Sequence, residues 1–418
     1  MKLPQRSTMI FFGAYILITV LVQALISFGI LNAFWSTLLR LGAVYAIVSL
    51  GLNLIYGFNG QFSLGQWGFY AIGAYVAADM TFRWTQQGSA SGLVILLLVV
   101  LLVGVSFLGV SWVLKRIPGL DPLSAFALYL VGVFAAAFLA IMLGRVLIDP
   151  ASSILKSIPD ALATQIVFFL AVLIAGVFAA EVSYLFGLPI LTLGSDYFGI
   201  ATLGFTIIVK VLLDNSDTML GFEEMKGARG MIGIPKIGSW LWVALFLLAV
   251  LIVTRNLLQS SHGRAIVSVR EDELAAKAMG IDVANQKIIT FVIGSLFAGL
   301  AGALYAHING FLHPNTFNFI KSFDPMIIIV FGGLGSVSGT LVVSFIWILV
   351  LEGLLRQVLP EGFETWRFVV YPLLLLIMML LRPKGLMGGT ELPYLRQILP
   401  PLRKKEAKPE EVAKAGGD

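Results

Sequence analysis

The sequence is dominated by uninterrupted apolar runs, and their length limits what the chain can fold into. Residues 92–114 read GLVILLLVVLLVGVSFLGVSWVL, and residues 371–381 read YPLLLLIMMLL. A helix needs about 20 consecutive apolar residues to cross the hydrocarbon core of a membrane. A transmembrane barrel would instead show segments of about ten residues with alternating polarity. The runs therefore predict membrane-spanning helices.

The composition agrees with an all-α integral membrane protein. Hydrophobic residues make up 58% of the chain and charged residues 12%, which is about half the charged share of a soluble domain. The 43 glycines suit packed membrane helices, in which small residues let backbones approach closely. We expect a polytopic helical bundle of about 10 to 12 spans, some of them short or broken. The expected apolar segments are 9–30, 35–56, 64–82, 92–114, 122–148, 162–187, 196–213, 238–258, 285–308, 324–355 and 366–381.

Basic residues beside the apolar runs predict the orientation of the spans. If Lys2 and Arg6 hold the N-terminus in the cytoplasm, alternating spans place Arg270 there as well. The stretch FGGLGSVSG at 331–339 interrupts the segment 324–355. We expect this interruption to give two short helices or a re-entrant pair. That even number of crossings would also return the C-terminus to the cytoplasm.

A charged segment, SHGRAIVSVREDELAAKAMGIDV at 261–283, stands between two apolar runs. Ser268 and Glu271 have the S-x-x-E spacing of a capping box, which predicts a helix start. Gly280 supplies a left-handed stop. We therefore expect one short, independently capped helix at 269–279.

This helix has two interpretations. Glu273 and Lys277 have the i, i+4 spacing of an ion pair, and Asp272 adds negative charge to the first turn. Leu274 and Met279 belong to an apolar side of the same helix. Such a helix either lies on lipid headgroups or docks against a cytoplasmic partner. The pattern alone does not decide between the two.

Two glycine-rich stretches carry polar residues into the apolar runs, at 51–75 and at 331–339. Amide and hydroxyl groups at membrane depth are costly unless they are paired or face water. Each stretch is therefore either a tightly packed turn or part of a translocation pathway. The candidate pathway residues are Asn53, Asn59, Gln61, Ser63, Gln66, Gly332, Gly333, Gly335 and Ser336.

Other polar features argue against an enzyme. No carboxylate cluster accompanies any of the three histidines, so no metal site is expected. Cys is absent, and neither a catalytic triad nor a nucleophile elbow is evident. A charge at the bilayer centre costs about 2.5 to 3.5 kcal/mol on insertion scales. We therefore expect Glu352 and Arg356 to form an intrahelical ion pair, and Arg40 to pair or to face a cavity.

The residues ELAAKAMG at 273–280 resemble the EAA loop of ABC importer permeases, the element that fits a groove on the ATPase subunit. The surrounding sequence is similar to the LivM-type permease subunits of branched-chain amino acid importers. The similarity continues in GLNLIYGFNGQFSLGQWGFYAIGAY, DYFGIATLGF, GARGMIGIP, VFGGLGSVSGT and LRPKGLMG, across most of the chain. The coupling residues that this resemblance implies are Gly263, Arg264, Arg270, Glu271, Asp272, Glu273, Ala275, Ala276 and Gly280.

The resemblance implies a transmembrane permease subunit that moves branched-chain amino acids across a bacterial inner membrane. Its partners would be a second homologous permease, two cytoplasmic ATPases, a periplasmic amino-acid-binding protein and membrane lipid, but no nucleic acid. The chain contains no Gly-Lys dipeptide and hence no phosphate loop. This chain would therefore carry no cofactor, and ATP and magnesium would bind the partner subunits. Urea, short amides or other amino acids are alternative cargoes, and a secondary transporter is a further alternative.

The domain organisation follows from the same patterns. We expect a single transmembrane domain at 1–395 and a charged cytoplasmic tail at 396–418, with both termini in the cytoplasm. Compared with typical relatives, the chain is longer between Gly73 and Asp196. Residues 92–158 are interpreted as an additional pair of spans, which would leave the later loops on their usual side.

Overall fold

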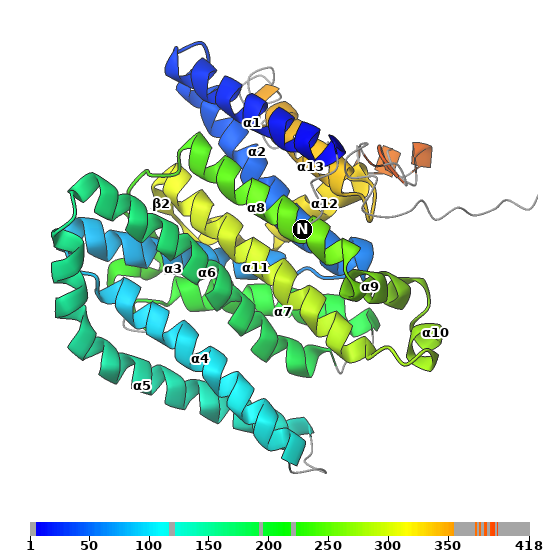
Figure 1. Cartoon of the computed structure of the whole chain (residues 1–418), viewed down its shortest axis with the longest axis horizontal. Helices are drawn as coiled ribbons and strands as arrows, with labels where there is room; N and C mark the ends of the chain where they lie inside the picture. Colours follow the sequence, from blue (N-terminus) through cyan, green and yellow to red (C-terminus); the bar gives the residue numbers. More distant parts are fainter. Residues whose placement is uncertain are drawn as a thin grey trace, which may run out of the picture.

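The protein was examined as a computed structural model that describes residues 6–116, 122–191, 195–218 and 223–354, with a few positions between 373 and 391. These residues form an almost entirely helical bundle (Figure 1). Within this part of the chain, 8 helices are long and apolar enough to cross a membrane. The prediction of an all-α, polytopic membrane protein is confirmed. The expected segment 366–381 lies largely outside the described residues, as does the tail.

The helices follow the expected apolar segments closely. The α-helices are α1 (Arg6–Ser27), α2 (Ala33–Leu52), α3 (Gln66–Gln87), α4 (Ser91–Arg116), α5 (Pro122–Lys156), α6 (Asp160–Ile190), α7 (Ser195–Asp214), α8 (Trp240–Gln259), α9 (Ser261–Glu271), α10 (Glu273–Ala278), α11 (Val283–Asn309), α12 (Phe323–Gly332) and α13 (Val337–Trp347). The π-helical turns η1 (Asn53–Phe58) and η6 (Ile348–Leu354) extend α2 and α13. The short 3-10 helices are η2 (Glu223–Met225), η3 (Gly227–Arg229), η4 (Pro314–Phe317) and η5 (Phe319–Ser322).

The centre of the bundle is the contact between α3 and α11, with α2 and α6 packed beside it. A Cβ atom at Gly73 of α3 would overlap the backbone of Gly299 in α11. A Cβ atom at Gly302 would likewise overlap the carbonyl of Tyr70. Small residues at membrane helix crossings allow this close approach of two backbones. The glycines in this part of the sequence therefore serve packing.

Helices α4 and α5 form a long hairpin along one edge of the bundle, against α6 (Figure 1). The two spans expected at 92–158 are therefore present as a pair. That they are additional to the family stays a prediction. Glu181 of α6, which the sequence reasoning did not single out, faces this hairpin, because a Cβ atom at Gly104 of α4 would lie 3.4 Å from its Oε1.

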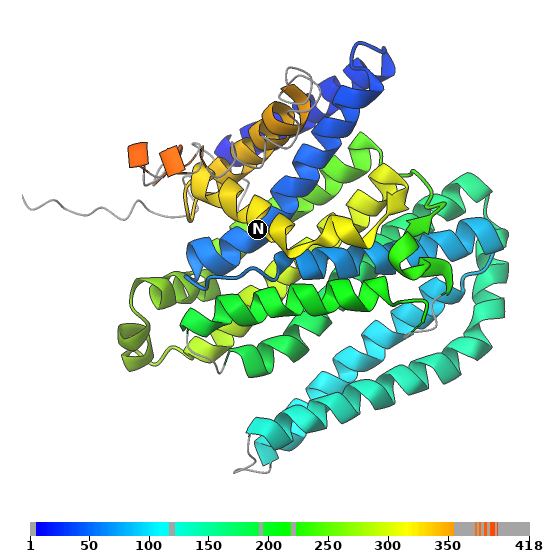
Figure 2. The ribbon, with the colours of Figure 1, turned by 180° about the vertical axis from the view of Figure 1, so that it is seen from behind.

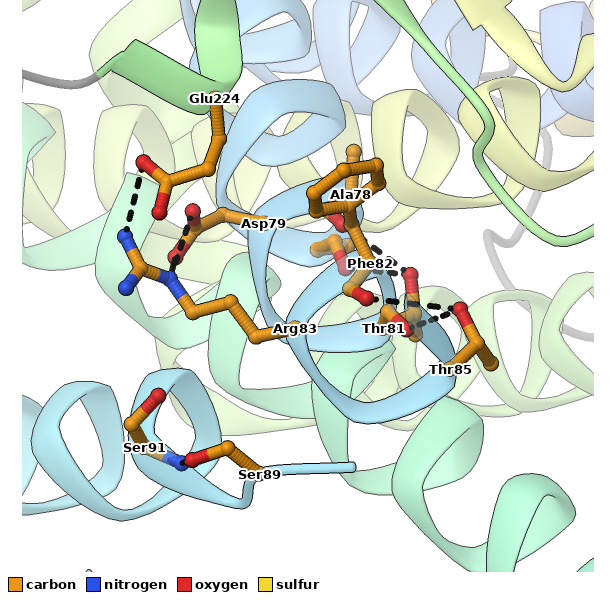
Figure 3. Close-up of polar contacts among 10 residues, drawn as sticks. Ala78, Asp79, Thr81, Phe82, Arg83, Thr85, Ser89, Ser91 and Glu224 are labelled. Atoms are coloured by element: carbon orange, nitrogen blue, oxygen red, sulfur yellow. Dashed lines mark hydrogen bonds and ion pairs between the residues drawn. The ribbon is translucent and has the colours of Figure 1, made fainter. Parts of the chain in front are cut away.

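The two ends of the bundle differ in structure. At one end, which we call the α10 end, α9 and α10 connect α8 to α11 (Figure 1). At the other, the β end, β1 (Met231–Ile232) pairs antiparallel with β2 (Phe311–Leu312). Arg83 of α3 fixes a loop at this end, because its guanidinium lies 3.0 Å from Asp79 and 3.3 Å from Glu224 of η2 (Figure 3).

The segment 324–355 is divided as expected, into α12 and α13 with a turn at 333–336. Helix α12 has only 10 residues, which corresponds to a rise of about 15 Å. The hydrocarbon core is about 30 Å thick, so α12 crosses about half of it. Seen from behind, α7 lies on the near face of the bundle (Figure 2), and it packs against η4 and η5, which precede α12.

Arg40 finds partners as expected, although none of those resolved is a carboxylate. Its guanidinium donates to the carbonyl of Gly238 at 3.0 Å and to that of Ser36 at 3.2 Å. It also donates to the Thr37 hydroxyl at 3.1 Å. The expected ion pair of Glu352 with Arg356 lies outside the described residues, since Arg356 is not among them.

Candidate coupling and pathway site

The charged segment at 261–283, which we call the coupling segment, contains two helices instead of the single predicted one. The prediction of one helix at 269–279 is wrong, because the chain becomes extended at Asp272, between α9 and α10. Asp272 Oδ1 accepts hydrogen bonds from the backbone N–H groups of Leu274 and Ala275, both at 2.9 Å. An aspartate whose side chain takes two free N–H groups is a strong helix N-cap.

The predicted capping box at Ser268 is not formed. Its hydroxyl lies inside α9 and donates to the carbonyl of Ala265 at 2.8 Å. The start of α9 is capped instead by Ser260, whose Oγ accepts from Gly263 N–H at 3.2 Å. Both Ser260 and Asp272 have extended backbones, as an N-cap requires.

The predicted stop at Gly280 is confirmed. Gly280 has φ +82°, and its N–H donates to the carbonyl of Lys277 at 3.0 Å. The N–H of Ile281 donates to the carbonyl of Ala276 at 3.1 Å, which completes a Schellman motif. Glu273 pairs with Lys287 of α11 at 2.7 Å, where the sequence suggested a pair with Lys277. This ion pair ties α10 to the start of the next span.

The remaining coupling residues divide into buried and exposed positions. Gly263 is buried at the corner between α8 and α9, where a Cβ atom would lie 2.5 Å from the Cα of Leu258. Ala276 is buried, whereas Arg264, Glu271 and Ala275 are exposed. Two apolar side chains on α10 and its C-cap are largely exposed. They are Leu274, which is 80% exposed, and Met279, which is 83% exposed.

Arg270 connects the coupling segment to both glycine-rich stretches. Its Nη1 donates to the carbonyl of Gly57 in η1 at 2.5 Å. A Cβ atom at Gly335 would lie 2.8 Å from this same Nη1, and one at Gly60 would lie 3.4 Å from Arg270 Cγ. The guanidinium therefore lies between two turns that lack side chains at the points of contact.

Asn53 joins the same two stretches from inside the bundle. Its Nδ2 donates to the carbonyl of Ser336 at 2.9 Å and to the hydroxyl of Thr340 at 3.0 Å. Its Oδ1 accepts from the backbone N–H of Gly335 at 3.0 Å. Asn53 is fully buried, and a Cβ atom at Gly57 would overlap its amide. One side chain thus fixes η1 to the turn between α12 and α13.

The turn between α12 and α13 needs its glycines for shape and for contact. Gly333 and Gly335 have φ values of +107° and +79°, which favour glycine. Gly332 lies so close to Gly339 of α13 that a Cβ atom on either would overlap the other backbone. Ser336 Oγ caps α13 by accepting from Gly339 N–H at 3.0 Å.

The stretch 60–65 is neither helix nor strand, and α7 contacts it. The hydroxyl of Thr202 accepts from Leu64 N–H at 3.0 Å, and the hydroxyl of Thr206 donates to the Leu64 carbonyl at 3.1 Å. The sequence reasoning missed these threonines. Two hydroxyls four residues apart in an apolar helix are the signal that could have identified them.

The candidate pathway residues at 59–66 are buried within the chain. Asn59 Nδ2 donates to Gln61 Oε1 at 3.1 Å, and Gly65 N–H donates to Ser63 Oγ at 3.3 Å. Among the described residues, neither polar atom of the Gln66 side chain has a hydrogen-bond partner. A pathway role for these residues stays a prediction.

Comparison with known proteins agrees with this arrangement. The sequence pattern of the family described as "Branched-chain amino acid transport system / permease component" matches residues 34–158 and 108–379. The two matches together cover most of the chain. The chain belongs to this family. The overlap of the matches, 108–158, includes the second part of α4 and all of α5 of this permease.

Two relatives from one organism resemble the permease. The high-affinity branched-chain amino acid transport system permease protein LivM of Escherichia coli (strain K12) is 27% identical over 84% of the chain and 69% of the relative. The corresponding LivH protein of the same strain is 24% identical over 84% of the chain and 93% of the relative. A probable LivM of Methanocaldococcus jannaschii is 27% identical over 57% of the chain and 72% of the relative. No solved structure matches the chain.

Proposed function

We propose that this permease is the membrane subunit of an ABC importer that carries branched-chain amino acids across a bacterial inner membrane. The relatives are named for branched-chain amino acid transport. The observation that carries the proposal is the contact of Arg270 with Gly57 and Gly335, because it gives a cytoplasmic motor a direct connection to the spans.

The α10 end faces the cytoplasm in this proposal, and both termini lie on that side. Lys115 and Arg116 form the last turn of α4, and Arg264 and Arg270 lie in α9. Short loops rich in Lys and Arg are retained in the cytoplasm. The β end would then face the periplasm and the amino-acid-binding protein.

The energy source lies in other subunits. The chain has no phosphate loop, so two separate ATPases would bind ATP and magnesium. The exposed apolar pair Leu274 and Met279 would enter the surface of one ATPase. Closure of the ATPases would pull α10, and Arg270 would pass the movement to the two glycine-rich turns. A second, homologous permease would complete the pathway, as the two kinds of relative in one organism suggest.

The cargo has alternatives within the same machinery. Urea, short amides and other amino acids remain possible cargoes, because a binding protein contributes much of the selectivity of such importers. The ligand retained by the binding protein encoded beside this permease identifies the cargo directly.

A reconstituted importer tests the proposal. The complete set of subunits in proteoliposomes should accumulate labelled L-leucine only with ATP inside and binding protein outside.

A double variant tests the coupling role. Replacing both Glu273 and Gly280 by Ala removes the ion pair to Lys287 and strains the C-terminal stop of α10. We expect this double variant to lose uptake while the ATPases still hydrolyse ATP. Gly109→Ala is the matched control, because a Cβ atom there meets no atom within 4 Å. Full uptake by the double variant would refute the coupling role.

A further inference from the structure

An ion pair joins the 3-10 helix η5 to the first turn of the half-length helix α12. Lys321 Nζ lies 3.2 Å from Asp324 Oδ2, and the side chain of Lys321 is 33% exposed. Tyr45 of α2 donates its hydroxyl to the same Asp324 oxygen at 3.4 Å. Asp324 itself is only 8% exposed. The lysine therefore faces open space, while the carboxylate is held inside the bundle.

The pair lies near the middle of the membrane. Helix α12 ends at the turn that contacts Arg270 at the α10 end, and it rises only about 15 Å from there to its start. Tyr45 confirms this depth independently, since it lies near the middle of α2 (Ala33–Leu52). The ring of Tyr45 lies 5.7 Å from Trp67 of α3, whose Nε1 donates to the carbonyl of Thr316 in η4.

Contact with lipid would be unfavourable for this part of the surface. A charge at the bilayer centre costs about 2.5 to 3.5 kcal/mol on insertion scales. Lys321 lies in the 3-10 helix η5, which follows η4, and backbone of this kind at membrane depth is found where protein or a water-filled cavity covers it. The exposed side of Lys321 therefore faces protein or water.

The immediate surroundings combine charge with apolar surface. Ile320 is 53% exposed, and Phe319 and Phe323 are 39% and 37% exposed. One positive group, one negative group and a cluster of exposed apolar side chains match the three parts of an apolar α-amino acid. These parts are its carboxylate, its ammonium group and its side chain.

We propose that Lys321 and Asp324 form a transit site for the zwitterionic head group of the transported amino acid. The inference deepens the proposed function and rests on it. In the empty site the two charges neutralise each other, so the site is stable at mid-depth without cargo. When an amino acid enters, its carboxylate pairs with the Lys321 ammonium and its ammonium group pairs with the Asp324 carboxylate. Both protein charges keep an opposite partner throughout.

A purely structural ion pair is the competing explanation, and the chain offers a matched control. Lys210 and Asp214 at the β end of α7 also pair within one helical turn, at 2.6 Å, with both side chains about as exposed as Lys321. Lys210→Gln with Asp214→Asn removes that pair. The corresponding test variants are Lys321→Gln, Asp324→Asn and the exchanged pair, Lys321→Asp with Asp324→Lys.

The experiment uses the complete importer in proteoliposomes. Uptake of labelled L-leucine is measured beside ATP hydrolysis stimulated by leucine-loaded binding protein and beside thermal stability in detergent. We expect each single variant to lower uptake about tenfold, the change that loss of about 1.4 kcal/mol of cargo interaction produces. Stimulated ATP hydrolysis and the Lys210 and Asp214 control should stay near wild type. The exchanged pair should restore stability but not uptake, because the cargo would meet both charges in the wrong order.

Several outcomes would overturn the inference. Uptake at the wild-type rate in either single variant would overturn it. Full recovery of uptake in the exchanged pair would also overturn it, because it would indicate a structural role for the ion pair. If a single variant fails to fold, the exchanged pair decides the question. Absence of leucine uptake by the wild type would instead refute the proposed function. The variants are then measured with the cargo that the binding protein retains, and an uncharged cargo such as urea contradicts the transit site.

Discussion

Arg270 of α9 donates a hydrogen bond to the carbonyl of Gly57, across 213 positions of sequence. The contact joins the segment that resembles an ATPase-docking loop to the first glycine-rich turn. The same guanidinium lies against Gly335 of the second turn. A rigid movement of α9 would therefore act on both turns at once, which is the basis of the coupling role proposed for this side chain.

Replacing Arg270 tests this connection. We expect Arg270→Ala to keep the subunits assembled and ATP hydrolysis active, while uptake falls about tenfold or more, because a lost contact of about 1.4 kcal/mol gives that factor. Arg270→Lys should recover only part of the uptake, since an ammonium lacks the planar donors of a guanidinium. Uptake and ATP hydrolysis are measured in the same proteoliposomes. Equal loss of both activities in Arg270→Ala would contradict a coupling role.

The fold was largely predictable, because long apolar runs allow few alternatives to spanning helices. The internal detail of the coupling segment was less predictable. Ser268 and Asp272 both have the sequence of an N-cap, and only the backbone shows that Asp272 takes the free N–H groups. The ion pair of Glu273 with Lys287 of α11, 14 positions away, was likewise not predicted from the local spacing, which favoured Lys277.

The candidate site could be predicted only in part, because several of its contacts are between distant residues. Thr202 and Leu64 lie 138 positions apart. The depth of Asp324 was also not predicted, because the interruption at 331–339 predicted that the segment 324–355 is divided but not where its first half begins in the membrane. The structure divides that span, and Asp324 then begins a helix that crosses about half of the hydrocarbon core.

Asn53 should be needed for stability as well as transport. Its buried amide makes two hydrogen bonds to the turn between α12 and α13 and one to Thr340 of α13. Asn53→Ala would leave the N–H of Gly335 without this partner, and an unsatisfied buried group costs about 1 to 3 kcal/mol. The Ser336 carbonyl would keep its hydrogen bond from the Thr340 hydroxyl. We expect a lower midpoint of thermal unfolding in detergent. Asn53→Asp keeps the acceptor for the Gly335 N–H but places an oxygen against the Ser336 carbonyl oxygen, so we expect it not to restore the midpoint. An unchanged midpoint in Asn53→Ala would contradict this role.

Two glycines, Gly299 at the contact of α11 with α6 and Gly109 in α4, should respond to Ala with opposite signs. A Cβ atom at Gly299 would lie 2.6 Å from the Cβ of Ala179, whereas one at Gly109 meets no atom within 4 Å. Overpacking costs about 1 to 3 kcal/mol, and Gly to Ala in an open helix position stabilises by about 0.5 to 1 kcal/mol. We therefore expect Gly299→Ala to lower the unfolding midpoint and Gly109→Ala to raise it or leave it unchanged. An unchanged unfolding midpoint in Gly299→Ala would show that the contact between α6 and α11 can adjust to the added methyl group.

The exposed pair Leu274 and Met279 should decide whether the ATPases bind. Both side chains are more than three-quarters exposed although they are apolar, and burial of such a side chain contributes about 1.5 to 3 kcal/mol. Replacing both by Ser should weaken association with the ATPases by about tenfold or more. Copurification of the ATPases with the permease measures this loss.

The cap at Asp272 and the ion pair of Glu273 with Lys287 do not involve these two side chains, so α10 should remain folded. Lys226→Ser, an exposed position at the β end, is the control and should leave copurification unchanged. If the double variant retains its ATPases, α10 lies on lipid headgroups, which is the alternative that its amphipathic pattern allowed.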